Sequence, residues 1–196
     1  TVVSAPSDAP TAFALTAQTS RADLIASVKA FAAAADSLCA VPTVSEAFVP
    51  FGDYAVVRSI IRARTFHPIF ITGDSGNGKT FQVEQACASE SREYLRVNIT
   101  EETDEDDLIG GFRLKNGETV FELGPVPVAM LRGAVLLLDE VDLAGPKVMC
   151  LQPVLEGRPL TIKKLGITVH PTSGFTVVAT ANTKGRGNDT GRFVGT

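Results

Sequence analysis

Residues 73–80 read Gly-Asp-Ser-Gly-Asn-Gly-Lys-Thr, which matches the phosphate-loop pattern G-x-x-x-x-G-K-[S/T]. An apolar run at 69–71 precedes this loop and a helical pattern over 81–90 follows it, as the motif requires. Glycines let backbone N–H groups close around phosphate oxygens, and the positive end of the following helix favours an anion. We therefore expect a bound nucleoside triphosphate to contact Ser75, Gly76, Asn77, Gly78, Lys79, Thr80 and Phe81.

Two acids after a second apolar run are candidates for the metal and the chemistry. Residues 134–138 are apolar, and Asp139 and Glu140 follow them. We expect the Thr80 hydroxyl and Asp139 to hold Mg²⁺, Asp139 usually through water. Glu140 would orient the attacking water while Lys79 faces the β- and γ-phosphates, because phosphoryl transfer depends on positioning and electrostatics.

Asn182 is the third candidate catalytic residue, beside Lys79 and Glu140. It follows an apolar run at 175–179. In an open α/β sheet the carboxyl ends of the strands face the ligand. Asn182 is therefore expected beside the γ-phosphate, where its side chain can detect whether this phosphate is present. Capping of a loop is the alternative role of an asparagine at this place.

The elements that must position these residues alternate in type. Apolar runs predict strands at 69–71, 94–97, 135–138 and 175–179, and helical patterns cover 54–64, 81–90 and 146–155. This alternation predicts a mostly parallel sheet with helices on both faces, a three-layer α/β/α fold of the P-loop NTPase class. Two β-hairpin inserts are expected, at 112–121, which contains Asn-Gly, and at 160–169.

The N-terminal region has a different composition. Residues 1–19 are rich in Ala, Thr, Ser and Pro and are expected to form a flexible tail. Ser20 and Asp23 form a capping-box pattern, and apolar residues then recur at steps of four and three. A helix is expected within 20–40, ending at Val41-Pro42, and it either packs on the main domain or docks on a partner. Residues 41–196 would form the nucleotide-binding core.

Composition excludes several classes of protein. The 196 residues carry 18 Lys+Arg and 22 Asp+Glu, a net charge of −4, which argues against nucleic-acid binding through bulk charge. No apolar run approaches the roughly 20 residues of a membrane span, and no Lys or Arg precedes Arg21 as in a signal peptide. Three separated cysteines fit neither a disulfide framework nor a zinc site, so a cytoplasmic protein is expected.

The acidic run at 101–107 is better explained as the first turn of a short helix than as a cation site. Carboxylates are favoured in the first turn by the helix dipole, and Thr103 is the expected N-cap.

Together these stretches resemble the AAA+ ATPases. The pattern looks most like the MoxR group and its cobaltochelatase ATPase-subunit (CobS-type) branch, including phage-encoded relatives. The resemblance begins near residue 41, and its main stretches are 73–80, 103–112, 136–142, 154–158 and 179–183.

The resemblance implies further properties. Asn182 matches the sensor-1 position, residues 51–54 lie where related ATPases shape the adenine pocket, and the two hairpins face the central pore or a partner. Family members form homo-oligomeric rings, commonly hexamers, and often work with a von Willebrand A-type partner. In the chelatase branch, ATP hydrolysis drives metal insertion into a corrin ring by a separate large subunit.

A complete module of this family continues with an arginine finger and a helical lid, and we recognise no counterpart of either here, so the lid is expected to be absent. Arg186 and Arg192 lie in a glycine-rich stretch and are expected to be solvated. The sequence therefore predicts an AAA+ ATPase core that binds Mg·ATP and hydrolyses it as a ring-forming motor subunit. The alternatives are the ATPase subunit of a cobalt chelatase in cobalamin synthesis, and a nucleotide-gated interaction module with little hydrolysis.

Overall fold

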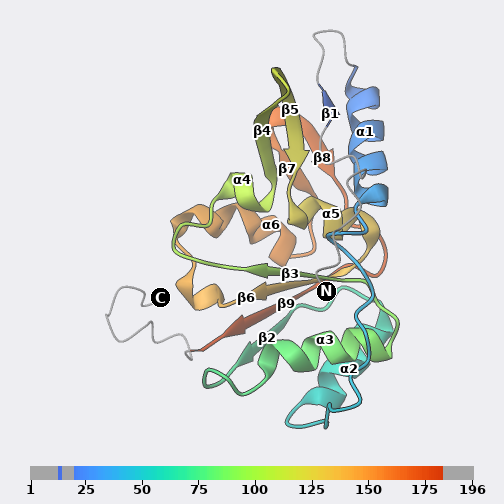
Figure 1. The fold of residues 1–196 in the computed structure, drawn as a ribbon, viewed down its shortest axis with the longest axis vertical. Helices are drawn as coiled ribbons and strands as arrows, with labels where there is room; N and C mark the ends of the chain where they lie inside the picture. The colour runs from blue at the N-terminus through green and yellow to red at the C-terminus, as the bar shows by residue number, and fades with distance from the viewer. Residues whose placement is uncertain (1–12, 15–19, 183–196) are drawn as a thin grey trace.

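Four parallel strands form the central sheet of the computed structural model, which describes residues 13–14 and 20–182 (Figure 1). Their order across the sheet is β2 (Ile69–Thr72), β9 (Thr176–Ala181), β6 (Val135–Asp139) and β3 (Tyr94–Asn98). The strands β2, β9 and β6 are parallel neighbours although they are distant in the sequence, so their carboxyl ends lie side by side at one edge of the sheet. The predicted phosphate loop, Asn182 and Glu140 follow these three strands directly.

Helices cover both faces of this sheet, which confirms the predicted three-layer fold. On one face, helices α2 (Tyr54–Ala63) and α3 (Lys79–Ser89) pack against Val135, Leu137 and Val178. On the other face, α5 (Pro125–Arg132) and the short helices η2 (Pro146–Leu151) and α6 (Gln152–Leu155) share a larger core with Leu136, Leu138 and Val177. The alternation of side chains along each strand thus produces two cores.

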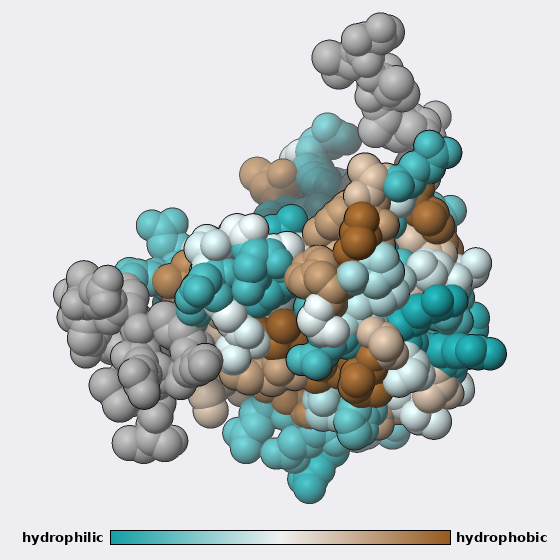
Figure 2. All heavy atoms as spheres, turned by 90° about the horizontal axis from the view of Figure 1, so that it is seen from below, coloured by the Kyte–Doolittle hydropathy of each residue, from teal (hydrophilic) through white to brown (hydrophobic). Residues whose placement is uncertain are grey.

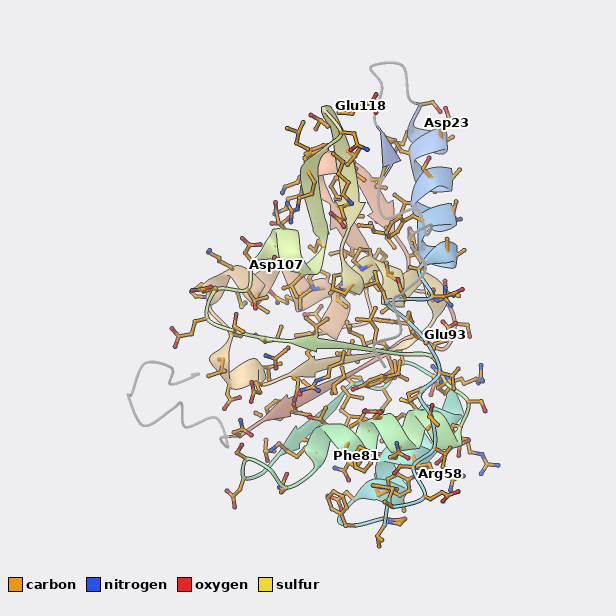
Figure 3. The ribbon with its side chains drawn as sticks, in the orientation of Figure 1. Asp23, Arg58, Phe81, Glu93, Asp107 and Glu118 are labelled. Atoms are coloured by element: carbon orange, nitrogen blue, oxygen red, sulfur yellow. The ribbon has the colours of Figure 1, made fainter. Side chains whose placement is uncertain are left out.

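Both predicted hairpins are present and lie together on the side of the sheet away from α3 (Figure 1). The first pairs β4 (Gly110–Lys115) with β5 (Glu118–Leu123) through Asn116-Gly117, with φ values of 52° and 82°, as expected for an Asn-Gly turn. Glu118 marks its far tip in Figure 3. The second pairs β7 (Leu160–Ile162) with β8 (Ile167–Val169) through the 3₁₀ turn η3 (Lys163–Leu165).

Helix α1 (Arg21–Ala34) packs on the main domain, and Val28 and Phe31 join its larger core. The Ser20–Asp23 capping box forms as predicted, but the helix ends at Ala34 and not at Val41-Pro42. The reason lies in Arg132, whose guanidinium caps the helix C-terminus by donating to the carbonyls of Ala32 and Ala33.

The same Arg132 guanidinium also pairs with Glu93 and Asp36, which fixes the chain just after the helix. Figure 3 shows Glu93 beside the lower end of α1. The short strand β1 (Phe13–Ala14) pairs with β5, and the rest of the predicted tail, residues 1–12 and 15–19, lies outside the described residues, as do Arg186 and Arg192.

Three other elements differ from the sequence-based prediction. The short acidic helix α4 (Glu105–Leu108) is capped by Asp104 in a capping box with Asp107, whereas the predicted cap, Thr103, is buried and accepts from the Thr100 amide. Prolines break the predicted helix at 146–155 into the 3₁₀ helix η2 and the single turn α6. Helix α5 was not predicted, because two prolines obscure it, although Pro is well placed in a first turn.

Within the described part of the chain, no helix has the length and apolar character needed to cross a membrane. The surface seen from the side of α2 and α3 shows apolar patches between hydrophilic groups (Figure 2). The exposed large apolar residues of these elements and of the segment between α1 and α2 are Leu38, Val41, Val44, Val49, Phe51, Val56 and Phe81.

A buried arginine joins three segments at the end of the sheet opposite the phosphate loop. Arg92 is 3% exposed, and its guanidinium donates to the carbonyls of Ile61 at 2.6 Å, Gly133 at 3.1 Å and Gly174. Burial lowers the pKa of Arg92, although an arginine stays charged at any physiological pH. This side chain therefore holds the end of α2, the end of α5 and the turn before β9 together.

We expect the Arg92→Met variant to lose about 3 kcal/mol or more of unfolding free energy, because three buried carbonyls each lose the hydrogen bond that the guanidinium donates. Urea denaturation followed by circular dichroism measures this loss. The matched control is Arg62→Met, since Arg62 is exposed and has only a 4.0 Å contact with Glu90; it should cost less than about 0.5 kcal/mol. Equal losses in the two variants would contradict the assigned role of Arg92.

Candidate functional site

The loop between β2 and α3 has the backbone shape of an anion cradle. Gly76 and Gly78 have φ values of 77° and 79°, in the left-handed region that glycine tolerates best. A Cβ atom on Gly78 would lie 3.0 Å from the Phe51 ring, so a side chain there would have to push this ring aside. Helix α3 starts at Lys79 with no side-chain cap from Gly78, so the amides of its first turn have no side-chain acceptor at that position and can receive an anion.

Lys79 connects this loop to the end of β9. Its side chain is buried, and Nζ donates to the carbonyls of Gly73 and Asp74, both at 2.9 Å. Nζ also lies 3.0 Å from Oδ1 of Asn182 and 3.4 Å from Oδ1 of Asn77. An ammonium group is therefore held at the centre of the cradle by neutral oxygen atoms alone.

The Asp139 carboxylate is the second centre of the site. The Thr80 hydroxyl lies 3.0 Å from each of its oxygens, and the Thr180 hydroxyl donates to Oδ1. Nη2 of Arg96 lies 2.6 Å from Oδ2. Burial favours the neutral acid, but the hydrogen bonds from the two threonines and the charge of Arg96 outweigh it, so the pKa of Asp139 falls below its usual value. Asp139 is thus ionised at neutral pH.

Glu140 turns the chain away from the sheet and stands next to Asn182. Its φ is 60°, a left-handed conformation that is costly for a residue other than glycine and that occurs often at functional sites. The Glu140 amide donates to the Thr180 hydroxyl at 3.3 Å, and Nδ2 of Asn182 lies 3.5 Å from Oε1 of Glu140. The backbone N–H of Asn182 donates to the Asp142 carboxylate, which fixes the position of Asn182 after β9.

The structure brings together five of the residues singled out in the sequence: Asn182 contacts Lys79 and Glu140, and Thr80 contacts Asp139. The Thr180 hydroxyl joins the two groups, because it bonds to both Asp139 and the Glu140 backbone amide. Ser75, Gly76 and Asn77 lie exposed on the loop. Phe81 lies on the first turns of α3 (Figure 3), 40% exposed, and its ring is 5.4 Å from that of Phe48. It belongs to an aromatic cluster beside the loop, with Phe48, Phe51 and Tyr54.

Sequence reasoning assigned no role to three residues of the site. Thr180 lies two residues before Asn182, so both face the same side of β9. Arg96 lies two residues before Asn98, which is paired with Asp139 across the sheet. A search for polar residues two positions before the asparagine that ends or follows a strand would have found both of these. Asp142 gave no such signal, because it follows the strand within the 3₁₀ turn η1 (Val141–Leu143).

The residues of this site suit Mg²⁺ bound together with a nucleotide. A hydroxyl and a carboxylate are the hard oxygen donors that Mg²⁺ prefers, and Mg²⁺ usually keeps waters and phosphate oxygens as its other ligands. Over residues 13–14 and 20–182, no group of three His, Cys, Asp or Glu side chains could form a metal site without such a nucleotide. The donor set therefore fits a metal that arrives with a triphosphate.

Comparison with known proteins gives consistent matches. The model of the AAA domain family, dynein-related subfamily, matches residues 68–192. Protein NorQ of Paracoccus denitrificans is 34% identical over 137 residues, covering 69% of this chain and 50% of that protein. The aerobic cobaltochelatase subunit CobS of a Sinorhizobium species is 36% identical over 135 residues, covering 65% of this chain and 40% of that protein. The chain thus spans half or less of the length of these two relatives.

Solved structures agree with the fold. A candidate ATPase from Cytophaga hutchinsonii superposes with a TM-score of 0.51 at 26% identity, covering 67% of this chain and 39% of that chain. NtrX from Brucella abortus superposes with a TM-score of 0.50 at 20% identity, covering 70% of this chain and 32% of that chain, a likeness of fold alone. With a phosphate loop, an acid-ended strand and a family match over residues 68–192, the chain belongs to the AAA domain family, in its dynein-related subfamily.

Proposed function

We propose that this chain binds Mg·ATP at the loop 73–80 and hydrolyses it. One observation carries the proposal: the Thr80 hydroxyl lies 3.0 Å from both Asp139 oxygens, while Lys79 Nζ lies 3.0 Å from the Asn182 amide oxygen. Three segments that are distant in the sequence thus bring together an ammonium group, a hydroxyl and a carboxylate that could bind a metal ion, and a side-chain amide. Nucleoside triphosphate chemistry needs these groups together.

Each residue has a role that its position supports. Lys79 would exchange its contacts with Gly73 and Asp74 for phosphate oxygens. Thr80 and Asp139 would hold Mg²⁺, which when bound neutralises charge on the phosphate oxygens. Glu140, beside Asn182, would orient the attacking water and accept its proton, and Asn182 would contact the γ-phosphate.

We further propose that the chain acts as a motor subunit in a cytoplasmic ring of identical copies, commonly six. The family match over residues 68–192 supports this, as do the two hairpins, which project away from the nucleotide face of α3. Phe112 and Leu114 on the first hairpin are 41% and 76% exposed, as expected for a surface that contacts a client or a partner. A von Willebrand A-type protein is the partner class we propose.

A second candidate is the ATPase subunit of a cobalt chelatase, favoured by the 36% identity to the cobaltochelatase subunit CobS. A third is a nucleotide-gated interaction module with little hydrolysis. Phosphate release measured over a range of protein concentrations separates the motor from the module. Turnover that depends on Glu140 supports the motor, whereas tight ATP binding without turnover supports the module.

We expect Lys79→Ala to weaken ATP binding by about tenfold to a hundredfold, because it removes the cation that faces the phosphates. Isothermal titration calorimetry measures the dissociation constant. Lys29→Ala is the matched control, since Lys29 is exposed on α1, and it should leave the affinity unchanged. Unchanged affinity in the Lys79 variant would place the nucleotide elsewhere.

Glu140→Gln should reduce ATP turnover by about a hundredfold or more while ATP still binds, because the amide cannot accept a proton from water. Steady-state phosphate release and nucleotide binding are measured on the same sample. Glu156→Gln, an exposed glutamate paired with Arg158, is the control and should retain full turnover. Full turnover in Glu140→Gln would remove this residue from the mechanism.

Asn182→Ala should retain ATP binding and slow hydrolysis by about tenfold to a hundredfold, because a polar contact to the transferred phosphoryl group is lost. Thermal unfolding distinguishes this from a structural role, since the Asn182 backbone contact to Asp142 does not need the side chain. A large fall in melting temperature with normal turnover would show that Asn182 is a structural cap.

A further inference from the structure

Arg96 is the one charged partner of Asp139 among the described contacts, and the proposed mechanism does not use it. It lies on β3, the strand beside β6, and its Nη2 approaches Asp139 Oδ2 at 2.6 Å. The Thr80 hydroxyl shares the same oxygen at 3.0 Å. The carboxylate therefore already has three donors: two hydroxyls and one guanidinium.

A carboxylate has about four acceptor sites, so these three donors leave little room for a metal ion or its water unless one donor withdraws. Thr180 is 1% exposed on the central strand β9, so it cannot move without disturbing the sheet. Thr80 lies on the first turn of α3 and is itself a proposed metal ligand. Arg96 differs from both, because its side chain is 51% exposed and extends from an edge strand by a flexible stem. It is the donor that can turn out into solvent.

We propose that Arg96 is a positioning residue that serves as the counter-ion of Asp139 before nucleotide binds and competes with Mg²⁺ for this carboxylate. Arg96 would thereby set the Mg²⁺ concentration at which ATP binds. This inference rests on the proposed function, because it concerns the same pocket.

Electrostatics gives the direction of the effect. The Arg96 guanidinium lies 2.6 Å from Asp139. It repels a divalent cation that binds beside the same carboxylate, and water only partly screens this repulsion. Mg²⁺ must therefore displace the guanidinium or bind next to it, and either event lowers the affinity of the site for Mg²⁺. A ligand shifts such an equilibrium only by the difference in its affinity for the two states. Removal of the Arg96 charge should then strengthen Mg²⁺ binding.

The test uses a fluorescent, non-hydrolysable ATP analogue titrated with Mg²⁺ at fixed protein concentration. For Arg96→Gln we expect half-saturation at about threefold to tenfold less Mg²⁺ than for the wild type, the size of a partly exposed ion pair. Affinity for the analogue in EDTA should not fall. Arg96→Lys keeps the positive charge but lacks the planar guanidinium, so its half-saturating Mg²⁺ concentration should lie between those of Arg96→Gln and the wild type. Arg96→Lys also provides the comparison with the wild type if Arg96→Gln is unstable.

The matched control is Arg113→Gln. Arg113 is similarly exposed, at 43%, and pairs at 3.7 Å with an acid, Asp106, that lies outside the site. Its Mg²⁺ requirement should equal that of the wild type. An unchanged or raised Mg²⁺ requirement in Arg96→Gln, or a loss of analogue binding in EDTA, would overturn the inference about Arg96 alone. A wild-type protein that does not bind the analogue would overturn the proposed function and this inference together.

Discussion

The carboxylate of Asp139 is the point on which the site depends. It receives hydroxyls from α3 and β9 and the guanidinium of Arg96 from β3, so four elements meet at one buried acid. The strand order β2-β9-β6-β3 makes this meeting possible, because β9 lies between β2 and β6, and β3 lies beside β6. The parallel sheet is therefore the device that brings residues 73–80, 139–140 and 182 together.

Two arginines hold the other described elements of the fold in place. Arg92 holds three carbonyls at the opposite end of the sheet, and Arg132 joins the end of α1 to Glu93. Both hairpins and α1 lie away from α3 (Figure 1). At the hairpins, Asp106 on α4 pairs with Arg113 of the first and Lys164 of the second. Ion pairs through Asp106 thus link the two inserts.

Much of this arrangement could be predicted from the sequence, because its signals are local. The phosphate loop, the apolar runs of the strands and the Asn-Gly turn each have a short-range pattern with a direct physical cause. What could not be predicted depends on contacts across the sheet. Arg96 resembles an ordinary exposed arginine on an edge strand, and only the register of β3 with β6 brings it to Asp139. The early end of α1 likewise depends on Arg132, about a hundred residues away.

We propose that the loop 73–80, the two acids and Asn182 line one pocket, and that a metal-bound triphosphate occupies this pocket. A crystal structure with Mg²⁺ and a non-hydrolysable ATP analogue tests this most directly. We expect Mg²⁺ at about 2.1 Å from the Thr80 hydroxyl oxygen, with Asp139 at most one water away and the γ-phosphate beside Asn182. An analogue bound outside residues 73–80, or a metal that contacts neither Thr80 nor the shell of Asp139, would contradict it.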